Sequence, residues 1–266
     1  MNRRMARMAE LLDRPAARLR SIFEEAGELA TLAVQGLWAL VRPPYDLRAW
    51  IAQAEQIGVR SLGVASITTI FTGMVMALQT ALSLPGLGVK YYIGTVVSKS
   101  LTRELGPVLV ALIVGGRIGA GMTAELGTMK VTEQIDAMRA MAADPIKKLV
   151  APKLAATLIM LPCLVVIGDF LGILGGLLIA VTQLQLPAGL YINDVLSSLT
   201  IGDVMSGVGK TVFFAFFISI VACYHGLNAK GGADGVGRAT TNTVVMASIF
   251  VLISDFFLTK LFFMFG

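Results

Sequence analysis

The sequence predicts an all-α integral membrane protein: an N-terminal amphipathic helix at the membrane interface, then about five transmembrane helices. Of the 266 residues, 56% are hydrophobic and 15% charged, against about 45–50% and about 25% in soluble domains. Several long runs carry few charges and hold the roughly 20 apolar residues that span a bilayer. Basic residues, which give a net charge of +5, lie mainly between these runs. Membrane orientation therefore explains them better than nucleic-acid binding.

The sequence predicts an N-terminal interfacial helical region in residues 1–58 and a transmembrane domain in residues 59–266. Apolar side chains between Met5 and Leu37 recur in steps of three, four or seven, with charged residues on the opposite face. This pattern is typical of a helix lying in the membrane interface. Pro15 and the Pro43-Pro44 pair favour breaks within the region. The alternative is an amphipathic helix packed on a partner protein.

The first span is predicted within the uncharged stretch Ser61–Val89, ending near Pro85. The second apolar region, Tyr91–Met122, contains charged residues, so we expect it to face other protein or a cavity rather than lipid. These charged residues are Lys99, Arg103, Glu104 and Arg117. After it, Thr123–Lys148 is too charged to span and predicts a helical loop in the cytoplasm.

The stretch Leu154–Ile192 is too long for one upright span and too short for two with a normal loop. It predicts a long third helix to about Val181 and an outer-face segment around Pro187. The fourth span is predicted between Lys210 and Lys230, and the fifth from about Thr240 to the C-terminus.

The basic residues predict the orientation. Of 22 lysines and arginines, nine precede Ser61, five lie in Thr123–Lys153 and two in Lys230–Arg238. With five spans, all three regions fall on one side, which the positive-inside rule assigns to the cytoplasm. The N-terminus is then cytoplasmic and the C-terminus lies outside.

Motifs for nucleotide or metal chemistry are incomplete. Gly209-Lys210-Thr211 resembles the end of a phosphate-binding loop, but Val204 stands where that loop requires glycine. The single histidine, His225, supports neither a metal site nor a catalytic triad. The sequence therefore predicts no enzyme activity, no metal and no cofactor on this chain.

Ionisable residues inside the predicted spans are the strongest chemical signal, because a charge at the bilayer centre costs at least about 2.5–3.5 kcal/mol. The candidates are Glu104, Asp169, Lys210, Asp255 and Lys260. One interpretation is pairing between helices, such as Glu104 or Asp255 with Lys210. The other is a polar floor or gate in a water-filled lipid pathway.

Several ordered motifs cover most of the chain after about Leu62. They are Phe71-Thr72-Gly73-Met74-Val75, Arg103-Glu104-Leu105-Gly106-Pro107, Gly116-Arg117-Ile118-Gly119-Ala120, Thr123-Ala124-Glu125-Leu126-Gly127, Thr132-Glu133-Gln134-Ile135-Asp136-Ala137-Met138, Asp144-Pro145, Arg238-Ala239-Thr240-Thr241 and Asp255-Phe256-Phe257-Leu258-Thr259. In sequence and order these motifs resemble the MlaE/YrbE family of ABC transporter permeases.

The resemblance implies the permease subunit of a phospholipid transporter in the bacterial inner membrane, which maintains the lipid asymmetry of the outer membrane. Implied partners are a second copy of the chain, two cytoplasmic ABC ATPase subunits, a periplasmic oligomer of MCE-domain proteins and, in many such systems, a STAS-domain protein. ATP and Mg²⁺ would then bind the ATPase.

The resemblance also implies two sites. A coupling helix at about 128–143 would contact the ATPase, through Glu133, Gln134, Asp136, Met138 and Arg139. A lipid cavity at the dimer interface would have apolar walls for acyl chains and a basic group for phosphate. Its residues would be Met76, Leu84, Leu87, Arg103, Glu104 and Lys210.

Other functions remain open from the sequence. An ion-coupled secondary transporter of a hydrophobic substrate would use Glu104, Asp169 and Asp255 as proton or sodium sites, although no inverted repeat is visible. An MCE-linked permease for sterols or fatty acids would need the same apolar cavity. An intramembrane scaffold without transport is the third alternative.

Overall fold

The computed structural model describes residues 23–43, 46–83 and 92–265. Residues 23–41 form an N-terminal helix. The helices that follow are α2 (Leu47–Ala54), α3 (Arg60–Ser83), α4 (Ile93–Ser100), α5 (Gly106–Val131), α6 (Gln134–Ala140), α7 (Ala151–Thr182), α8 (Ala188–Ser198), α9 (Ile201–Leu227) and α10 (Gly232–Phe265). No strand occurs in these ranges, which confirms the predicted all-α class.

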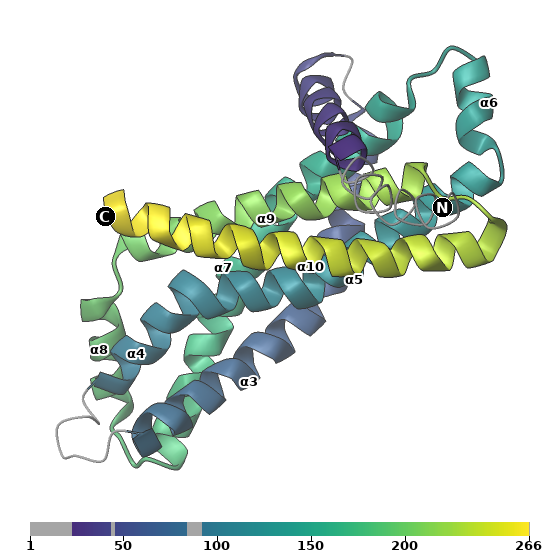
Figure 1. The fold of residues 1–266 in the computed structure, drawn as a ribbon. Coiled ribbons are helices and arrows are strands. Elements are labelled where there is room, and N and C mark those ends of the chain that lie inside the picture. Colours follow the sequence, from purple (N-terminus) through teal and green to yellow (C-terminus); the bar gives the residue numbers. More distant parts are fainter. Residues whose placement is uncertain (1–22, 44–45, 84–91, 266) are drawn as a thin grey trace, which may run out of the picture.

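Five of the helical stretches that the structure describes are long and apolar enough to cross a membrane, as the sequence predicts. They are Leu47–Ser83, Ile93–Val131, Ile146–Thr182, Ile201–Leu227 and Gly232–Phe262. Figure 1 shows α9 and α10 running side by side, with α3 and α7 crossing them obliquely. The loop that carries α6 and the turn between α9 and α10 share one end of the bundle, here named the α6 end. The other is the α8 end.

Three predicted boundaries were wrong. Helix α5 continues beyond Met122 to Val131, and α10 begins at Gly232 rather than near Thr240. Helix α9 begins at Ile201, nine residues before Lys210, because Thr200 and Asp203 form a capping box that supplies its first hydrogen bonds. Charge alone therefore does not end these helices.

Three π-helical turns join short helices to long ones, at Glu55–Val59, Leu101–Leu105 and Ile146–Val150. In the second and third, a proline follows two residues after the turn, Pro107 and Pro152. Because proline has no N–H to donate to the carbonyl four residues earlier, it favours a wider local turn. The first turn joins α2 to α3 without a break in the helix. It contains residue 58, the predicted end of the N-terminal region.

Glycines allow α3 and α7 to pack backbone to backbone. A Cβ added at Gly73 would overlap the carbonyl of Gly172, and one at Gly175 would overlap the carbonyl of Ile70. Such close packing gives dispersion contacts between helices that lipid cannot supply. The two helices therefore form one rigid pair.

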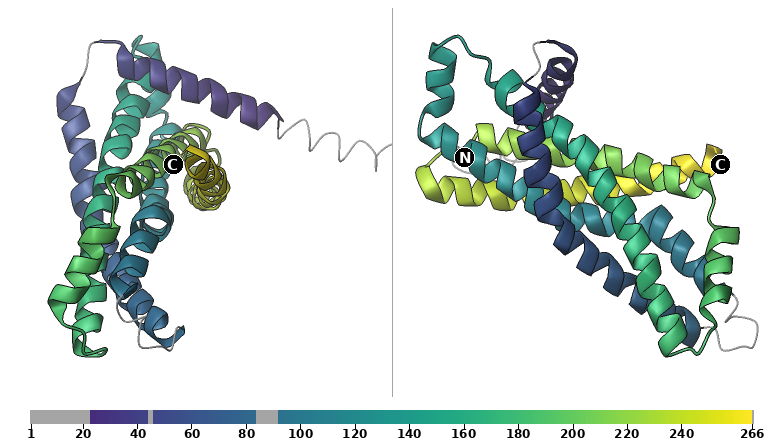
Figure 2. Two further views of the ribbon diagram at one scale, coloured as in Figure 1. Left: turned by 90° about the vertical axis from the view of Figure 1, so that its left-hand side faces the viewer. Right: turned by 180° about the vertical axis from the view of Figure 1, so that it is seen from behind.

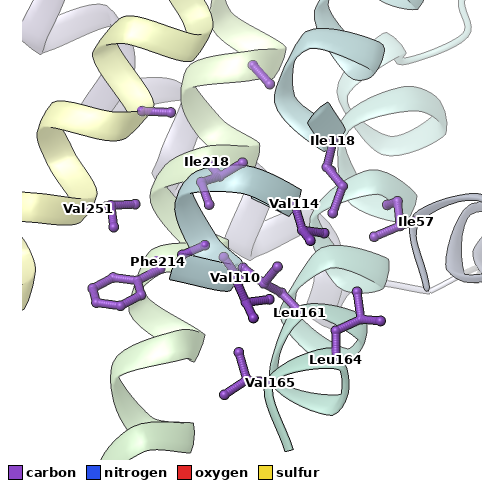
Figure 3. Packing of buried hydrophobic residues seen from close by; sticks show 14 of the residues in the cluster. Ile57, Val110, Val114, Ile118, Leu161, Leu164, Val165, Phe214, Ile218 and Val251 are labelled. Carbon is purple, nitrogen blue, oxygen red and sulfur yellow. The ribbon is translucent and has the colours of Figure 1, made fainter. Parts of the chain in front are cut away.

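The largest apolar core lies where α5, α7 and α9 meet, with α10 on one side. Figure 3 shows Val110 and Val114 of α5 beside Leu161 and Val165 of α7, with the ring of Phe214 of α9 on the side of α10. The structure fixes α5 in the middle of the bundle, with its polar residues at both ends of this core.

The helix of residues 23–41 lies across the bundle rather than along it (Figure 2). Its Ala26, Leu29 and Ala33 line an apolar cavity of about 340 Å³ with Phe217 of α9 and Phe250 of α10. This crosswise position suits the predicted interfacial helix. The predictions on residues 1–22, including the break at Pro15, lie outside the described residues.

Candidate functional site

A polar cluster around Lys210 joins three parts of the chain within the span region. The Lys210 side chain is 1% exposed, and its Nζ lies 2.6 Å from Oε2 of Glu104 and 3.2 Å from Oδ1 of Asp255. Nζ also donates to the hydroxyl of Thr259 at 2.7 Å, and that hydroxyl donates to Glu104. One buried ammonium group thus pairs with two carboxylates, and pairing is how charges inside a membrane are usually accommodated.

The π-helical turn supplies the third hydrogen bond of Lys210. Nζ donates to the backbone carbonyl of Arg103 at 3.1 Å. In an α-helix that carbonyl would accept from the N–H four residues later, but Pro107 stands there. The sequence therefore leaves a carbonyl inside the membrane region that a lysine side chain satisfies, since an ammonium has three N–H donors.

Gly207 brings α9 close enough for this contact. A Cβ at Gly207 would overlap the carbonyl of Thr102 in the π-helical turn. Lys210 lies one helical turn further along α9, so the close approach at Gly207 sets its distance from Glu104. The ion pair between Arg103 Nε and Asp203 Oδ1, at 3.4 Å, joins the same turn to the start of α9.

The cluster forms the floor of a cavity of about 280 Å³. Three basic residues, Lys99, Arg103 and Lys210, line it with Glu104 and the ring of Phe262. The Arg103 side chain is 43% exposed and Glu104 is 42% exposed, whereas Lys210 is closed off beneath them. The structure thus brings together Arg103, Glu104 and Lys210 of the predicted lipid cavity.

The other residues predicted for the lipid cavity, and the intramembrane Asp169, lie away from the Lys210 cluster or outside the described residues. Met76 packs against a second apolar cluster around Ala77, Val97 and Tyr191. Leu84 and Leu87 lie outside the described residues. Asp169 is 7% exposed and lies against Gly106, and its Oδ1 accepts no hydrogen bond from a described residue.

The predicted coupling helix is α6, which is shorter than expected at seven residues. It is anchored by Ile135, which is fully buried, while four of the predicted contact residues are exposed. These are Glu133, Gln134, Asp136 and Arg139. Met138 is half-buried and lines a cavity of about 560 Å³ with Trp50 and Lys147.

Charge pairs stiffen α6. Lys130 Nζ lies 2.8 Å from Asp136, and Arg139 lies 3.5 Å from the same carboxylate. The hydrogen bond from Lys130 lowers the pKa of Asp136 below its ordinary value. Glu133, just before the helix, has a left-handed backbone with φ of 60°.

Sequence reasoning missed a second buried lysine. Lys153 was counted with the basic loop, but its side chain is 2% exposed and its Nζ lies 2.5 Å from Oε2 of Glu125. It also donates to Oε1 of Gln53 at 3.3 Å. The sequence gives little signal for this pair, because Glu125 is 40% exposed and only the fold shows that Lys153 is buried.

Within the described residues, no group of three or more His, Cys, Asp and Glu side chains is placed to hold a metal ion. A buried cation beneath an open basic rim favours an anionic group at the rim and apolar chains beside it.

Comparison with known proteins gives the family. The family model of permease MlaE matches residues 50–261. A probable ABC transporter permease protein of Rickettsia conorii is 45% identical over 240 residues, which cover 90% of this chain and 93% of that protein. A probable ABC transporter permease protein of Synechocystis is 40% identical, covering 81% of this chain and 82% of that protein.

A plant protein is also similar. The chloroplastic protein TRIGALACTOSYLDIACYLGLYCEROL 1 of Arabidopsis thaliana is 34% identical over 232 residues, covering 87% of this chain and 66% of that protein. Permeases of this family bind no cofactor, and hydrolysis of ATP takes place on separate subunits. The chain therefore belongs to the MlaE permease family and is the membrane-spanning subunit of an ABC transporter.

Proposed function

We propose that this permease moves phospholipid between the bacterial inner membrane and a periplasmic MCE-domain oligomer, and so maintains the lipid asymmetry of the outer membrane. It acts as a homodimer on two cytoplasmic ABC ATPase subunits, with a STAS-domain protein as a further partner. The α6 end faces the cytoplasm and the α8 end the periplasm, as the basic residues near the α6 end favour.

The observation that carries the proposal is the cavity floored by Lys210. Its basic rim is partly exposed and consists of Lys99 and Arg103, of which Arg103 also pairs with Asp203, whereas Lys210 is buried and paired with Glu104 and Asp255. A phosphate group would pair with the rim by charge-assisted hydrogen bonds. Acyl chains would contact apolar surface, each buried methylene contributing about 0.8 kcal/mol.

Two further facts support lipid rather than ion transport. Glu104 and Asp255, two of the three carboxylates that an ion-coupled transporter would use as ion sites, are both paired with Lys210. The family consists of ABC transporter permeases, which take their energy from ATP. The name of the Arabidopsis relative refers to a diacylglycerol lipid, which is consistent with a two-chain substrate.

Lipid transfer in a reconstituted system tests the proposed cavity. The permease, its ATPase and the MCE protein are placed in vesicles, and ATP-dependent transfer of fluorescent phosphatidylglycerol is measured. We expect Arg103→Gln to lower the transfer rate by about tenfold or more, the value of one charged hydrogen bond. Lys260→Gln, an exposed lysine on α10 next to Thr259, is the matched control and should transfer normally.

Substrate class is tested in the same vesicles with a sterol and a free fatty acid. Two results together would support the proposal. Phospholipid transfer falls in Arg103→Gln, and sterol is not transferred by the unmodified protein. Equal transfer of sterol, or an unchanged rate in Arg103→Gln, would contradict it.

The coupling role of α6 is tested by ATP hydrolysis. We expect Glu133→Gln combined with Asp136→Asn to reduce lipid-stimulated hydrolysis while the complex remains assembled. Asp234→Asn, an exposed carboxylate in the first turn of α10 at the same end, is the control. Normal stimulation in the double variant would remove α6 from the coupling pathway.

A further inference from the structure

A second polar cavity lies between the start of the first span and the middle of α5. It has a volume of about 210 Å³ and is lined by Arg117, Glu125, Gln53 and Gln56, with Gly121 between the two charged residues. It shares no residue with the cavity around Lys210. Polar side chains from α2, the first π-helical turn and α5 therefore gather at a position that the proposed transport site does not use.

Arg117 is unusual for a residue in a membrane span, because it is exposed and incompletely paired. Its Nη1 donates to the hydroxyl of Ser61 at 2.6 Å, and this is its only hydrogen bond to a described residue. A guanidinium has five N–H donors in a planar fork. The remaining donors suit an anionic group such as a phosphate, which pairs with the fork at two points.

The depth of Arg117 matches that of lipid headgroups. Its partner Ser61 is the first residue of the uncharged stretch that runs to Val89. Helix α3, with 24 residues, rises about 36 Å, slightly more than the roughly 30 Å of hydrocarbon. Charged residues occupy the earlier part of the first candidate span, Leu47–Arg60, so its uncharged part fits the hydrocarbon best. This places Ser61 at the hydrocarbon boundary on the α6 side, where phosphates of that leaflet lie.

The surroundings of the cavity suit both parts of a phospholipid. One turn from the Arg117–Ser61 pair toward the α8 end, Val64 of α3 and Ile113 of α5 are 40% and 43% exposed, and they offer apolar surface to acyl chains. In the opposite direction, Lys153 occupies Oε2 of Glu125. Oε1 of Glu125 accepts no hydrogen bond from a described residue and is available to a headgroup donor.

We propose that this cavity binds the headgroup of a glycerophospholipid from the leaflet at the α6 end, with its phosphate on Arg117 and an amine or hydroxyl donor toward Glu125. The inference rests on the proposed function for its orientation, in which that leaflet is the cytoplasmic one. It adds a second headgroup position to the one proposed at Lys99 and Arg103.

Photolabelling tests the site without requiring transport. The full permease–ATPase complex is placed in nanodiscs of phosphatidylethanolamine and phosphatidylglycerol, without ATP. Each sample contains a trace of phosphatidylethanolamine or of diacylglycerol carrying the same diazirine near the glycerol end of one chain. We expect peptides containing Val64 and Ile113 to be labelled by the phospholipid about tenfold more than by diacylglycerol, which lacks the phosphate.

Two variants remove the site by independent means. Arg117→Gln removes the charge, and Gly121→Leu fills the space, where an added Cβ meets nothing within 4 Å and folding should be preserved. Both should reduce phospholipid labelling to the diacylglycerol level, and Arg117→Lys should retain part of it. Arg60→Gln, an exposed basic residue beside Ser61, is the control and should label normally.

The outcomes separate this inference from the proposed function. Equal labelling by diacylglycerol in the unmodified complex, which needs no variant, would overturn the headgroup site, as would normal labelling of both Arg117→Gln and Gly121→Leu. Arg103→Gln should leave labelling here unchanged. If ATP-driven transfer fails but labelling follows this pattern, the proposed function is wrong and the headgroup site stands.

Discussion

The ammonium group of Lys153 lies 2.5 Å from a carboxylate oxygen of Glu125, which joins the start of α7 to the last third of α5. The two partners differ in environment, since the lysine side chain is 2% exposed and the glutamate is 40% exposed. Loss of one partner therefore has a different consequence from loss of the other. A buried charge without its counterion is costly, whereas an exposed one is solvated by water.

We expect Glu125→Gln to lower the free energy of unfolding by about 1–3 kcal/mol. This is less than the roughly 3–5 kcal/mol of a fully buried pair, because Glu125 is partly solvated. Lys153→Met keeps the apolar stem and should cost less, about 1 kcal/mol or under. Thermal unfolding in detergent measures both, with the exposed Lys148→Met as control. A larger loss in Lys153→Met than in Glu125→Gln would show that the burial argument is wrong.

Gly207→Ala should damage both stability and transfer. Its Cβ would overlap the Thr102 carbonyl, so α9 must move away from the π-helical turn, at a cost of about 1–3 kcal/mol. Because Lys210 moves with α9, phospholipid transfer should fall as well. Gly237→Ala, where the Cβ meets nothing within 4 Å, should instead stabilise α10 by roughly 0.5–1 kcal/mol. An undiminished melting temperature in Gly207→Ala would exclude the close approach.

Pro107→Ala separates stability from activity. Alanine restores an N–H that competes for the Arg103 carbonyl, now bonded to Lys210, and it removes a proline from within the helical span. We expect an equal or higher melting temperature but a transfer rate about tenfold lower or more, the value of one hydrogen bond from a charged donor. Pro152→Ala, which follows the third π-helical turn in the same way, should not change the rate. A fall in both the melting temperature and the transfer rate would disprove this role of the Arg103 carbonyl.

Titration of Asp136 should leave α6 intact at neutral pH. The folded-state pKa is lowered from its ordinary value of 3.8 by the Lys130 hydrogen bond. The pair thus stabilises the folded state fully at pH values above 3.8, and this contribution is lost as the pH falls through the lowered pKa. Hydrogen exchange of residues 134–140, corrected for intrinsic rates, should stay constant above about pH 5. Faster exchange as the pH falls from about 7 to about 5 would contradict the lowered pKa of Asp136.

The spans and the helix after the second span could be predicted because they depend on local composition. Uncharged runs and a charged, helix-prone loop are visible within one window of sequence. The start of α9 was missed although Thr200 and Asp203 carry a capping signal three residues apart. Lys210 instead suggested a span boundary, because lysine is normally excluded from lipid.

The polar clusters could be predicted only in part, because their partners are distant in sequence. Glu104 and Lys210 are 106 residues apart, and their pairing was one of two interpretations. Lys153 and Gln53 are 100 residues apart, and no periodic pattern links them. The free carbonyl of Arg103 follows from Pro107, but only the folded chain shows which side chain satisfies it.

The brevity of α6 has a mechanical consequence. It is about 10 Å long and lies between two residues with left-handed backbones, Glu133 and Ala142, which fix the direction of the chain on either side. On one side it continues from α5, which packs on α9 and α10, and on the other it leads to α7, which packs on α3. A displacement of this short helix would therefore act on α5 and α7 together, and these two helices share the largest apolar core with α9.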